Sequence, residues 1–179
     1  SDVKTNKIGR NTYIWQYSVV LENAVIGDNC NINCHTFIEN NVIIGNNVTV
    51  KSGTQLWDGL TIKDNVFIGP NVSFTNDKYP RSKQYPDTFS KTIIEQNVSI
   101  GAGSVILPGI TIGAYSIVGA GSIVTRDIPS RALVIGQPAF IIGWLNDNGT
   151  KMERDGDFFL DNTGKRWTLI NNNLKLKNG

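Results

Sequence analysis

The chain has 179 residues, enough for one domain with a small appendage. Its net charge of +2 is too low for the concentrated basic face that a nucleic acid or an acidic membrane surface requires. No uninterrupted apolar run reaches the ~18 residues of a membrane span. We therefore expect neither a nucleic-acid partner nor a membrane-embedded segment.

The two cysteines indicate the cellular compartment, and the single histidine limits which metal sites are possible. Cys30 and Cys34 lie four residues apart in an extended segment, so roughly 13 Å separates them, more than the ~4.4–6.8 Å that a disulfide spans. Two unpaired thiols, and a first segment without the apolar core of a signal peptide, predict a cytoplasmic protein. His35 is the single histidine, which excludes a three-histidine zinc site, and we expect no metal.

Apolar residues recur at every sixth position from Ile8 onwards. The series runs without a miss through twelve positions: Ile8, Ile14, Val20, Ile26, Ile32, Ile38, Ile44, Val50, Leu56, Ile62, Ile68 and Phe74. It resumes as Ile94, Ile100, Ile106, Ile112, Val118 and Val124. A second inward series, mostly small or β-branched, follows each member by four residues, as Val42 and Val48 do.

A period of six fits neither an α-helix nor an indefinitely alternating strand. It fits a short strand followed by a tight turn, with three such units closing an 18-residue triangular coil. Gly and Asn fill the expected turns, where unusual backbone angles are needed. A β-sandwich would not hold one spacing through twelve repeats. The sequence therefore predicts an all-β fold, a parallel β-helix over residues 1–143.

Two segments break the period. Phe74 and Ile94 are twenty residues apart, so part of 76–91 must leave the wall as a loop, either a functional excursion or a decorative insertion. From residue 144 to 179 the period is lost. We expect a C-terminal β-hairpin extension there, turning at 161–164 and capping the open end of the helix.

The 18-residue coil places Asp58 beside Asn76, at the point where the loop departs. Neighbouring coils are roughly 4.8 Å apart, so a carboxylate and a carboxamide meet at the loop mouth and can orient a polar nucleophile. The alternative is an ordinary ladder of turn formers. His35 lies on a different corner and is either an inert exposed turn residue or a base.

Two segments resemble the hexapeptide-repeat acetyltransferases: GNNVTVKSGTQLWDGLTIKDNVFIGPNVSFTND with YPRS, and SIGAGSVILPGITIGAYSIVGAGSIVTRDIPSRALVIGQPA. The first, with its loop mouth, is similar to the sugar N-acetyltransferases of lipopolysaccharide and S-layer glycan biosynthesis. The resemblance covers about residues 8–143. It implies a left-handed β-helix, a homotrimer with active sites between neighbours, and acetyl-coenzyme A as co-substrate. Similar domains occur fused to a dTDP-hexose ketoisomerase, so this chain is either fused to such an enzyme or works with one.

The resemblance also implies roles for individual residues. It implies that Asp58 and Asn76 contact the amino sugar. With His35, the alternative base reached from a neighbouring subunit, they make up the expected catalytic set. The residues expected to bind the substrate are Trp57, Asp77, Tyr79 and Arg81. The residues expected to bind acetyl-coenzyme A are Gly101, Ala102, Gly119, Ala120 and Arg126. Phe140 departs from the family, whose members often carry Arg after the GxPA motif.

The implied substrate is a nucleotide-linked 3-amino-3,6-dideoxyhexose. O-acetyltransferases need a strong base, and many carry a histidine in or beside the loop, whereas residues 76–91 contain none. A neutral amine needs mainly positioning, and the departing thiolate can take its surplus proton. O-acetylation of a sugar, N-acetylation of a UDP-linked amino sugar, and a non-catalytic scaffold stay as alternatives.

Overall fold

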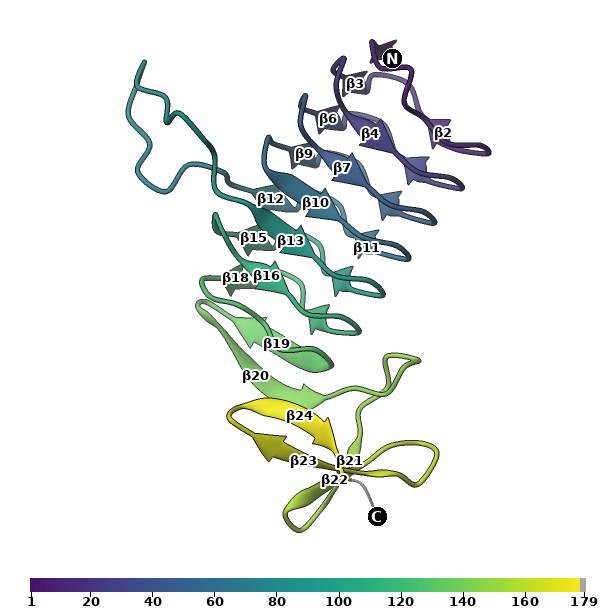
Figure 1. Ribbon diagram of the computed structural model, residues 1–179, viewed down its shortest axis with the longest axis vertical. Coiled ribbons are helices and arrows are strands. Elements are labelled where there is room, and N and C mark those ends of the chain that lie inside the picture. Colours follow the sequence, from purple (N-terminus) through teal and green to yellow (C-terminus); the bar gives the residue numbers. More distant parts are fainter. Residues whose placement is uncertain (178–179) are drawn as a thin grey trace.

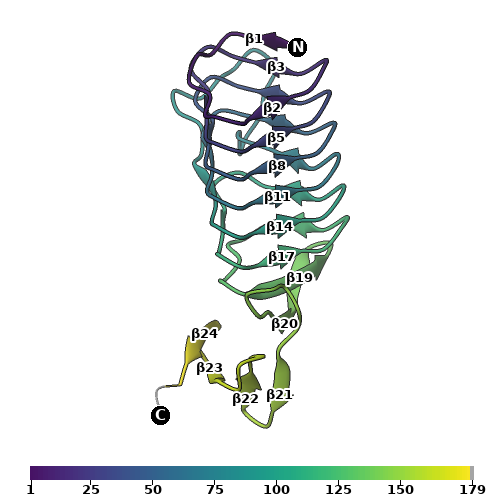
Figure 2. The same ribbon diagram turned by 90° about the vertical axis from the view of Figure 1, so that its right-hand side faces the viewer.

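The chain folds into a three-sided prism of stacked coils, followed by a small separate sheet (Figures 1 and 2). The structure is a computed structural model that describes residues 1–177. No helix occurs in that range, and the expected parallel β-helix is confirmed.

Each side of the prism is a sheet of very short parallel strands, except that the last two strands of sheet C form a longer antiparallel pair. Sheet A contains β1 (Asp2–Val3), β3 (Val19–Val20), β6 (Phe37–Ile38), β9 (Gln55–Leu56), β12 (Ser73–Phe74), β15 (Val105–Ile106) and β18 (Ile123–Val124). Sheet B contains β4 (Val25–Ile26), β7 (Ile43–Ile44), β10 (Leu60–Ile62), β13 (Thr92–Ile94) and β16 (Thr111–Ile112). Sheet C contains β2 (Tyr13–Ile14), β5 (Asn31–Ile32), β8 (Thr49–Val50), β11 (Phe67–Ile68), β14 (Ser99–Ile100), β17 (Ile117–Val118), β19 (Ala132–Gly136) and β20 (Ala139–Trp144).

The chain visits these sheets in the order C, A, B, so it turns at three corners, named here C/A, A/B and B/C. Within the regular coils strand partners are 18 residues apart, as Ile44 and Ile62 are, and in the last coil the separation shortens to 16, as between Val118 and Val134. Ile62 instead pairs with Ile94, 32 residues on. The difference, 32 − 18 = 14 residues, is the length of the inserted loop.

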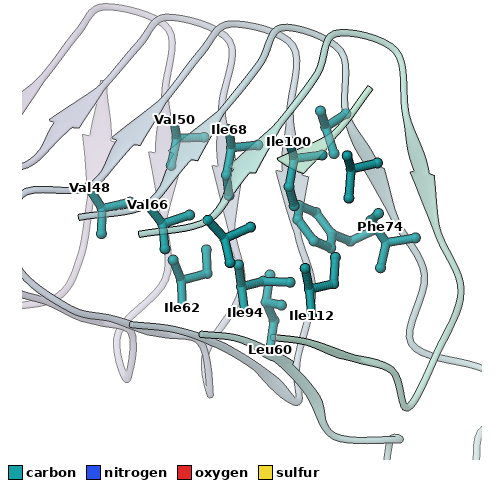
Figure 3. Close-up of a cluster of buried hydrophobic side chains, with 14 of the residues drawn as sticks. Val48, Val50, Leu60, Ile62, Val66, Ile68, Phe74, Ile94, Ile100 and Ile112 are labelled. Carbon is teal, nitrogen blue, oxygen red and sulfur yellow. The ribbon is translucent and has the colours of Figure 1, made fainter. Parts of the chain in front are cut away.

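The inward positions form one sealed apolar column. Figure 3 shows part of it as two rows: Val50, Ile68 and Ile100 in one, and Ile62, Ile94 and Ile112 in the other. From Val20 to Phe74 every sixth residue is at most 4% exposed, each isoleucine contributing roughly 1.5–3 kcal/mol through burial. Ile8 and Ile14 are only half-buried, because no complete coil precedes the first one.

The corners need left-handed backbone, and on the B/C corner asparagine supplies most of it. The B/C corner uses Asn11, Asn29, Asn47, Asn65 and Asn97 at φ between 55° and 59°. Asn tolerates this conformation better than other residues with a side chain.

The C-terminal segment forms an antiparallel sheet beyond the last coil. Its strands are β21 (Glu153–Asp155), β22 (Phe158–Leu160), β23 (Arg166–Ile170) and β24 (Asn173–Leu176). The expected turn is present between β22 and β23, where hydrogen bonds from Thr163 and Trp167 to the Asp161 carboxylate outweigh its desolvation and lower the pKa of that group. The last two residues of the expected 144–179 extension lie outside the described range.

Arg131 ties this sheet to the helix. Its guanidinium lies 4.8 Å from the ring centroids of both Tyr115, on the last full coil, and Trp167, on β23. It also pairs with Asp147 and donates to the carbonyl of Leu145 at 3.3 Å. The Arg131 side chain is 17% exposed and that of Asp147 is 71% exposed, so the ring contacts are largely shielded from water and the ion pair is not.

Arg131→Ala is expected to loosen the C-terminal sheet by ~1–2 kcal/mol, since a desolvated cation–π contact is worth up to ~2 kcal/mol. Amide hydrogen exchange should rise in 153–176 and stay unchanged in the coils. Arg166→Ala is the matched control, because its 57% exposed side chain makes a surface ion pair that contributes little. Equal protection of 153–176 in both variants would show that Arg131 does not hold the sheet.

Candidate functional site

Asp58 and Asn76 are neighbours on the A/B corner, at the mouth of the inserted loop. The Asn76 carboxamide donates to the backbone carbonyl of Asp58 at 3.4 Å. Both residues line a hollow of about 10 Å³, together with Trp57, Ser90 and Thr92. Such a volume admits about one water molecule, so a larger ligand must approach from the open side of the corner.

The Asp58 carboxylate is held in place from the preceding coil. Its Oδ1 accepts from the backbone of Asn41 at 2.8 Å, and its Oδ2 accepts from the Asn41 carboxamide at 3.0 Å. The Asp58 amide donates to Glu39 at 2.8 Å. An ionised carboxylate has about four acceptor positions, so these contacts orient the group and leave capacity for a ligand.

Part of this arrangement is an ordinary corner ladder. On the B/C corner, Asp28 accepts from the amide of Arg10 at 2.6 Å, and Asp64 accepts from the amide of Asn46 at 2.7 Å. The Asp58–Asn41 contact is of the same kind. What distinguishes Asp58 is the loop beside it.

The neck of the loop is tightly built, and its tip is exposed. The Ser90 amide donates to the carbonyl of Asn76 at 3.3 Å, which closes the neck. Gly59 makes room for it, because a Cβ there would lie 2.7 Å from the Ser90 carbonyl oxygen. The loop then projects away from the prism (Figure 1).

Of the residues expected to bind substrate, the structure brings only Trp57 to the hollow. Asp77 accepts from the Tyr79 amide at 2.8 Å, a local turn, and Arg81 donates to the adjacent Pro80 carbonyl. Tyr79 is 77% exposed. None of these three loop residues lines the hollow of their own chain.

His35 lies on the C/A corner, separated from Asp58 by sheet A, as its place in the coil predicts. Its ring stacks on Tyr17 with centroids 5.2 Å apart and planes 11° apart. Both residues have positive φ, 61° for Tyr17 and 58° for His35. The next residue of this column is Gly53, and the space beside it is partly taken, because a Cβ there would collide with the Asn71 carboxamide.

The residues expected to bind acetyl-coenzyme A fall into two groups. Arg126 follows β18 on the A/B corner, in the same column as Asp58, whereas the others follow β14 and β17 on the C/A corner: Gly101, Ala102, Gly119 and Ala120. Ala102 and Ala120 are exposed, and a Cβ at the neighbouring Gly103 or Gly121 would meet nothing within 4 Å. The C/A corner is therefore open and smooth here, but it lies across sheet A from Arg126.

A cavity of about 330 Å³ adjoins Arg126. Its lining includes Pro129, Phe140 and Asn172, and Phe140 is 58% exposed. The cavity thus combines a cation, an aromatic ring and a carboxamide from the β23–β24 turn. The sequence gives no signal for Asn172, because the C-terminal sheet has no periodicity from which the positions of its turns could be predicted.

The remaining titratable groups offer no further centre. Burial raises the pKa of the Cys30 thiol, so it stays protonated, and neither cysteine forms a disulfide. Residues 1–177 contain no group of three or more His, Cys, Asp or Glu side chains arranged to hold a metal. That range also holds no helix long and apolar enough to cross a membrane.

Comparison with known proteins agrees with this architecture. The family model described as bacterial transferase hexapeptide (six repeats) matches residues 7–40, 41–76 and 91–126. The chain belongs to this family. The match omits 77–90, the fourteen residues of the inserted loop.

Among relatives of this hexapeptide transferase, the dTDP-3-amino-3,6-dideoxy-alpha-D-galactopyranose 3-N-acetyltransferase of Aneurinibacillus thermoaerophilus is 56% identical over 170 residues, covering 92% of this chain and 86% of the relative. The galactoside O-acetyltransferase of Lactococcus lactis is 40% identical over 88 residues, covering 47% of this chain and 42% of the relative. A crystal structure of AntD, an N-acyltransferase from Bacillus cereus in complex with dTDP and coenzyme A, superposes with a TM-score of 0.70 at 24% identity, covering 76% of this chain and 83% of that chain. This last likeness supports the fold.

Proposed function

We propose that this enzyme transfers an acetyl group from acetyl-coenzyme A to the 3-amino group of a dTDP-linked 3-amino-3,6-dideoxyhexose. The observation that carries the proposal is the 56% identity, over 92% of the chain, to an enzyme named for that reaction. The O-acetyltransferase relative matches less than half of the chain. The product would be a building block for surface glycans, made in the cytoplasm beside, or fused to, a dTDP-hexose ketoisomerase.

In the proposed reaction, Asp58 and Asn76 hold the amine. Asn41 fixes the Asp58 carboxylate in one orientation, and Asn76 presents its carboxamide one coil further on. Correct placement of two reactants supplies up to ~7–11 kcal/mol in favourable cases. Acetyl-coenzyme A supplies an activated acetyl group: the N–C bond forms as the C–S bond breaks, and the leaving thiolate takes the surplus proton of the amine.

The A/B corner offers a path for acetyl-coenzyme A. Three coil steps lead from Asp58 to Arg126, roughly 14 Å at the usual strand spacing. The path ends at the cavity that Arg126, Phe140 and Asn172 share, where a phosphate could pair with the cation and a purine could stack on the exposed ring. Gly101, Ala102, Gly119 and Ala120 lie on the C/A corner, too far round the prism to join this path.

We also propose a homotrimer with sheet B facing the three-fold axis. The outward column of sheet B is β-branched: Val25, Ile43, Thr61, Ile93 and Thr111. Ile43 is 50% exposed in the single chain. This packing sets the A/B corner of one chain beside the B/C corner of the next, so each loop mouth lies in a cleft between subunits.

Sedimentation at micromolar concentration should give a trimer, and Ile43→Asp should give a monomer with less than about a hundredth of the activity, because a charge at the axis is left unpaired. Phe67→Asp is the matched control. It is 40% exposed on sheet C and should leave the trimer intact. A monomeric wild-type enzyme with full activity contradicts the proposed assembly.

Thiol release from acetyl-coenzyme A, measured against a panel of acceptors, tests the function. The expected substrate is a dTDP-linked 3-amino-3,6-dideoxyhexose. UDP-linked amino sugars and a galactoside should react at least tenfold more slowly. Preferential acetylation of the galactoside hydroxyl would replace the proposal by O-acetylation, and no turnover with any acceptor would favour a scaffold.

A further inference from the structure

Four aromatic side chains form a band across the N-terminal half of sheet A. The band consists of Tyr17, His35, Phe37 and Trp57. Tyr17 stacks on His35, and Phe37 packs against Trp57 with centroids 5.3 Å apart and planes 50° apart. Trp57 is the residue before Asp58, so the band runs from the C/A corner to the loop mouth.

Core packing does not explain the outer end of this band. Tyr17 is 73% exposed, and His35 is exposed as well. At the same place in the following coils the chain has Gly53, Asn71, Gly103 and Gly121, residue types that adopt left-handed backbone readily. A bulky Tyr in this conformation has a conformational cost, whereas His adopts it more readily. The exposed pair of stacked rings, at a place where later coils have Gly or Asn, points to a role in binding.

The stack leaves one ring face available for a ligand. Tyr17 covers one face of His35, and the two planes are nearly parallel. The opposite face is directed along the column toward Gly53, which has no side chain, with the Asn71 carboxamide one coil further on. The Asn71 carboxamide fills part of the space over Gly53, so a planar ring that lies on His35 must displace this carboxamide toward the edge of the ring.

The same coil that contains Gly53 contains Asp58. The two residues flank β9 and are five residues apart, so they are separated by at most ~16 Å, the length of a fully extended segment. A base, ribose, diphosphate and hexose joined end to end cover a comparable length. Gln55 points outward between them and pairs in register with Phe37.

We infer that the nucleotide part of the sugar substrate lies along the outer face of β9, with its base stacked on His35 and its amine at Asp58 and Asn76. This inference rests on the proposed function. It makes His35 a specificity-determining residue that stacks on the base instead of a general base. Contact with a second copy of the chain suits the β-branched outward face of sheet B better than it suits this band. Gln55 and Asn71 lie next to the band and supply hydrogen-bonding groups for the edge of a nucleotide base.

Two substitutions of His35 separate stacking from proton transfer. His35→Ala should raise KM for the dTDP-linked amino sugar about tenfold, which corresponds to the lower part of the range of free energies for base–aromatic stacking. The value of kcat should stay within twofold, and KM for acetyl-coenzyme A should not change. His35→Phe keeps a ring and removes the imidazole, so it should restore KM and kcat. Titration calorimetry with dTDP alone should show the same order of affinity, wild type and His35→Phe above His35→Ala.

Loss of kcat in both variants would make His35 a base and overturn the inference. If His35→Ala keeps wild-type kinetics and wild-type affinity for dTDP, the thymine ring must bind elsewhere, and this result would also overturn the inference. A variant that dissociates into monomers would assign the band to subunit contact instead. If wild type binds dTDP through His35 yet acetylates no dTDP-linked sugar, the binding site stands and the proposed function fails.

Discussion

Ile68→Asp is expected to prevent the chain from folding. Ile68 is fully buried on β11, which pairs with β8 on one side and β14 on the other, and its neighbours in the column are apolar (Figure 3). The substitution removes a buried isoleucine, worth ~2–5 kcal/mol on truncation, and adds an unpaired carboxyl that must be desolvated. The sum of these two costs is comparable to the whole free energy of unfolding of a typical domain, ~5–15 kcal/mol.

Soluble yield and thermal unfolding followed by circular dichroism measure this effect. Phe67→Asp is the matched control, since it places the same charge on the same strand but on the outward face. Its stability should stay within ~1 kcal/mol of wild type. A soluble Ile68→Asp variant with an unchanged melting temperature would mean that the inward register is misassigned.

Much of the fold is predictable because one spacing determines it. A period of six fixes which residues face inward, and three periods fix which coils are neighbours, so the pairing of Ile44 with Ile62 follows from counting. The interruption between Phe74 and Ile94 predicts a loop in the same way. The Arg131 contacts could not be predicted, because they join segments that share no repeat.

The candidate site was predictable to the level of Cα positions. Counting places Asp58 beside Asn76, and the structure brings them together. The partners of their polar atoms depend on side-chain rotamers, which no periodicity specifies: the Asp58 carboxylate bonds to Asn41, and Asn76 reaches only the Asp58 carbonyl. The cavity at Arg126 likewise depends on where the C-terminal sheet lies.

Asp58→Asn and Asn76→Ala are each expected to lower kcat/KM about tenfold to a hundredfold without unfolding the trimer. Each removes one orienting hydrogen bond to the substrate amine, and hydrogen bonds to charged groups contribute ~1.5–3 kcal/mol. Steady-state thiol release measures the loss, and thermal unfolding checks the fold. Because Asp58 keeps an acceptor oxygen for Asn41 when it becomes Asn, its structural contact should weaken only partly.

Asp28→Asn separates catalysis from corner stability. Asp28 makes the same kind of ladder contact as Asp58, accepting from the Arg10 amide. It lies on the B/C corner two coils nearer the N-terminus than Asp58, roughly 10 Å along the prism axis, so in the proposed trimer it is also displaced from the loop mouth of the neighbouring chain. Both Asp→Asn variants should lower the melting temperature by a similar few degrees, while only Asp58→Asn should lose activity. Equal kcat/KM in Asp58→Asn, Asn76→Ala and Asp28→Asn would show that Asp58 and Asn76 only stabilise a corner, as Asp28 does. The amine would then have to be held by residues of a neighbouring chain.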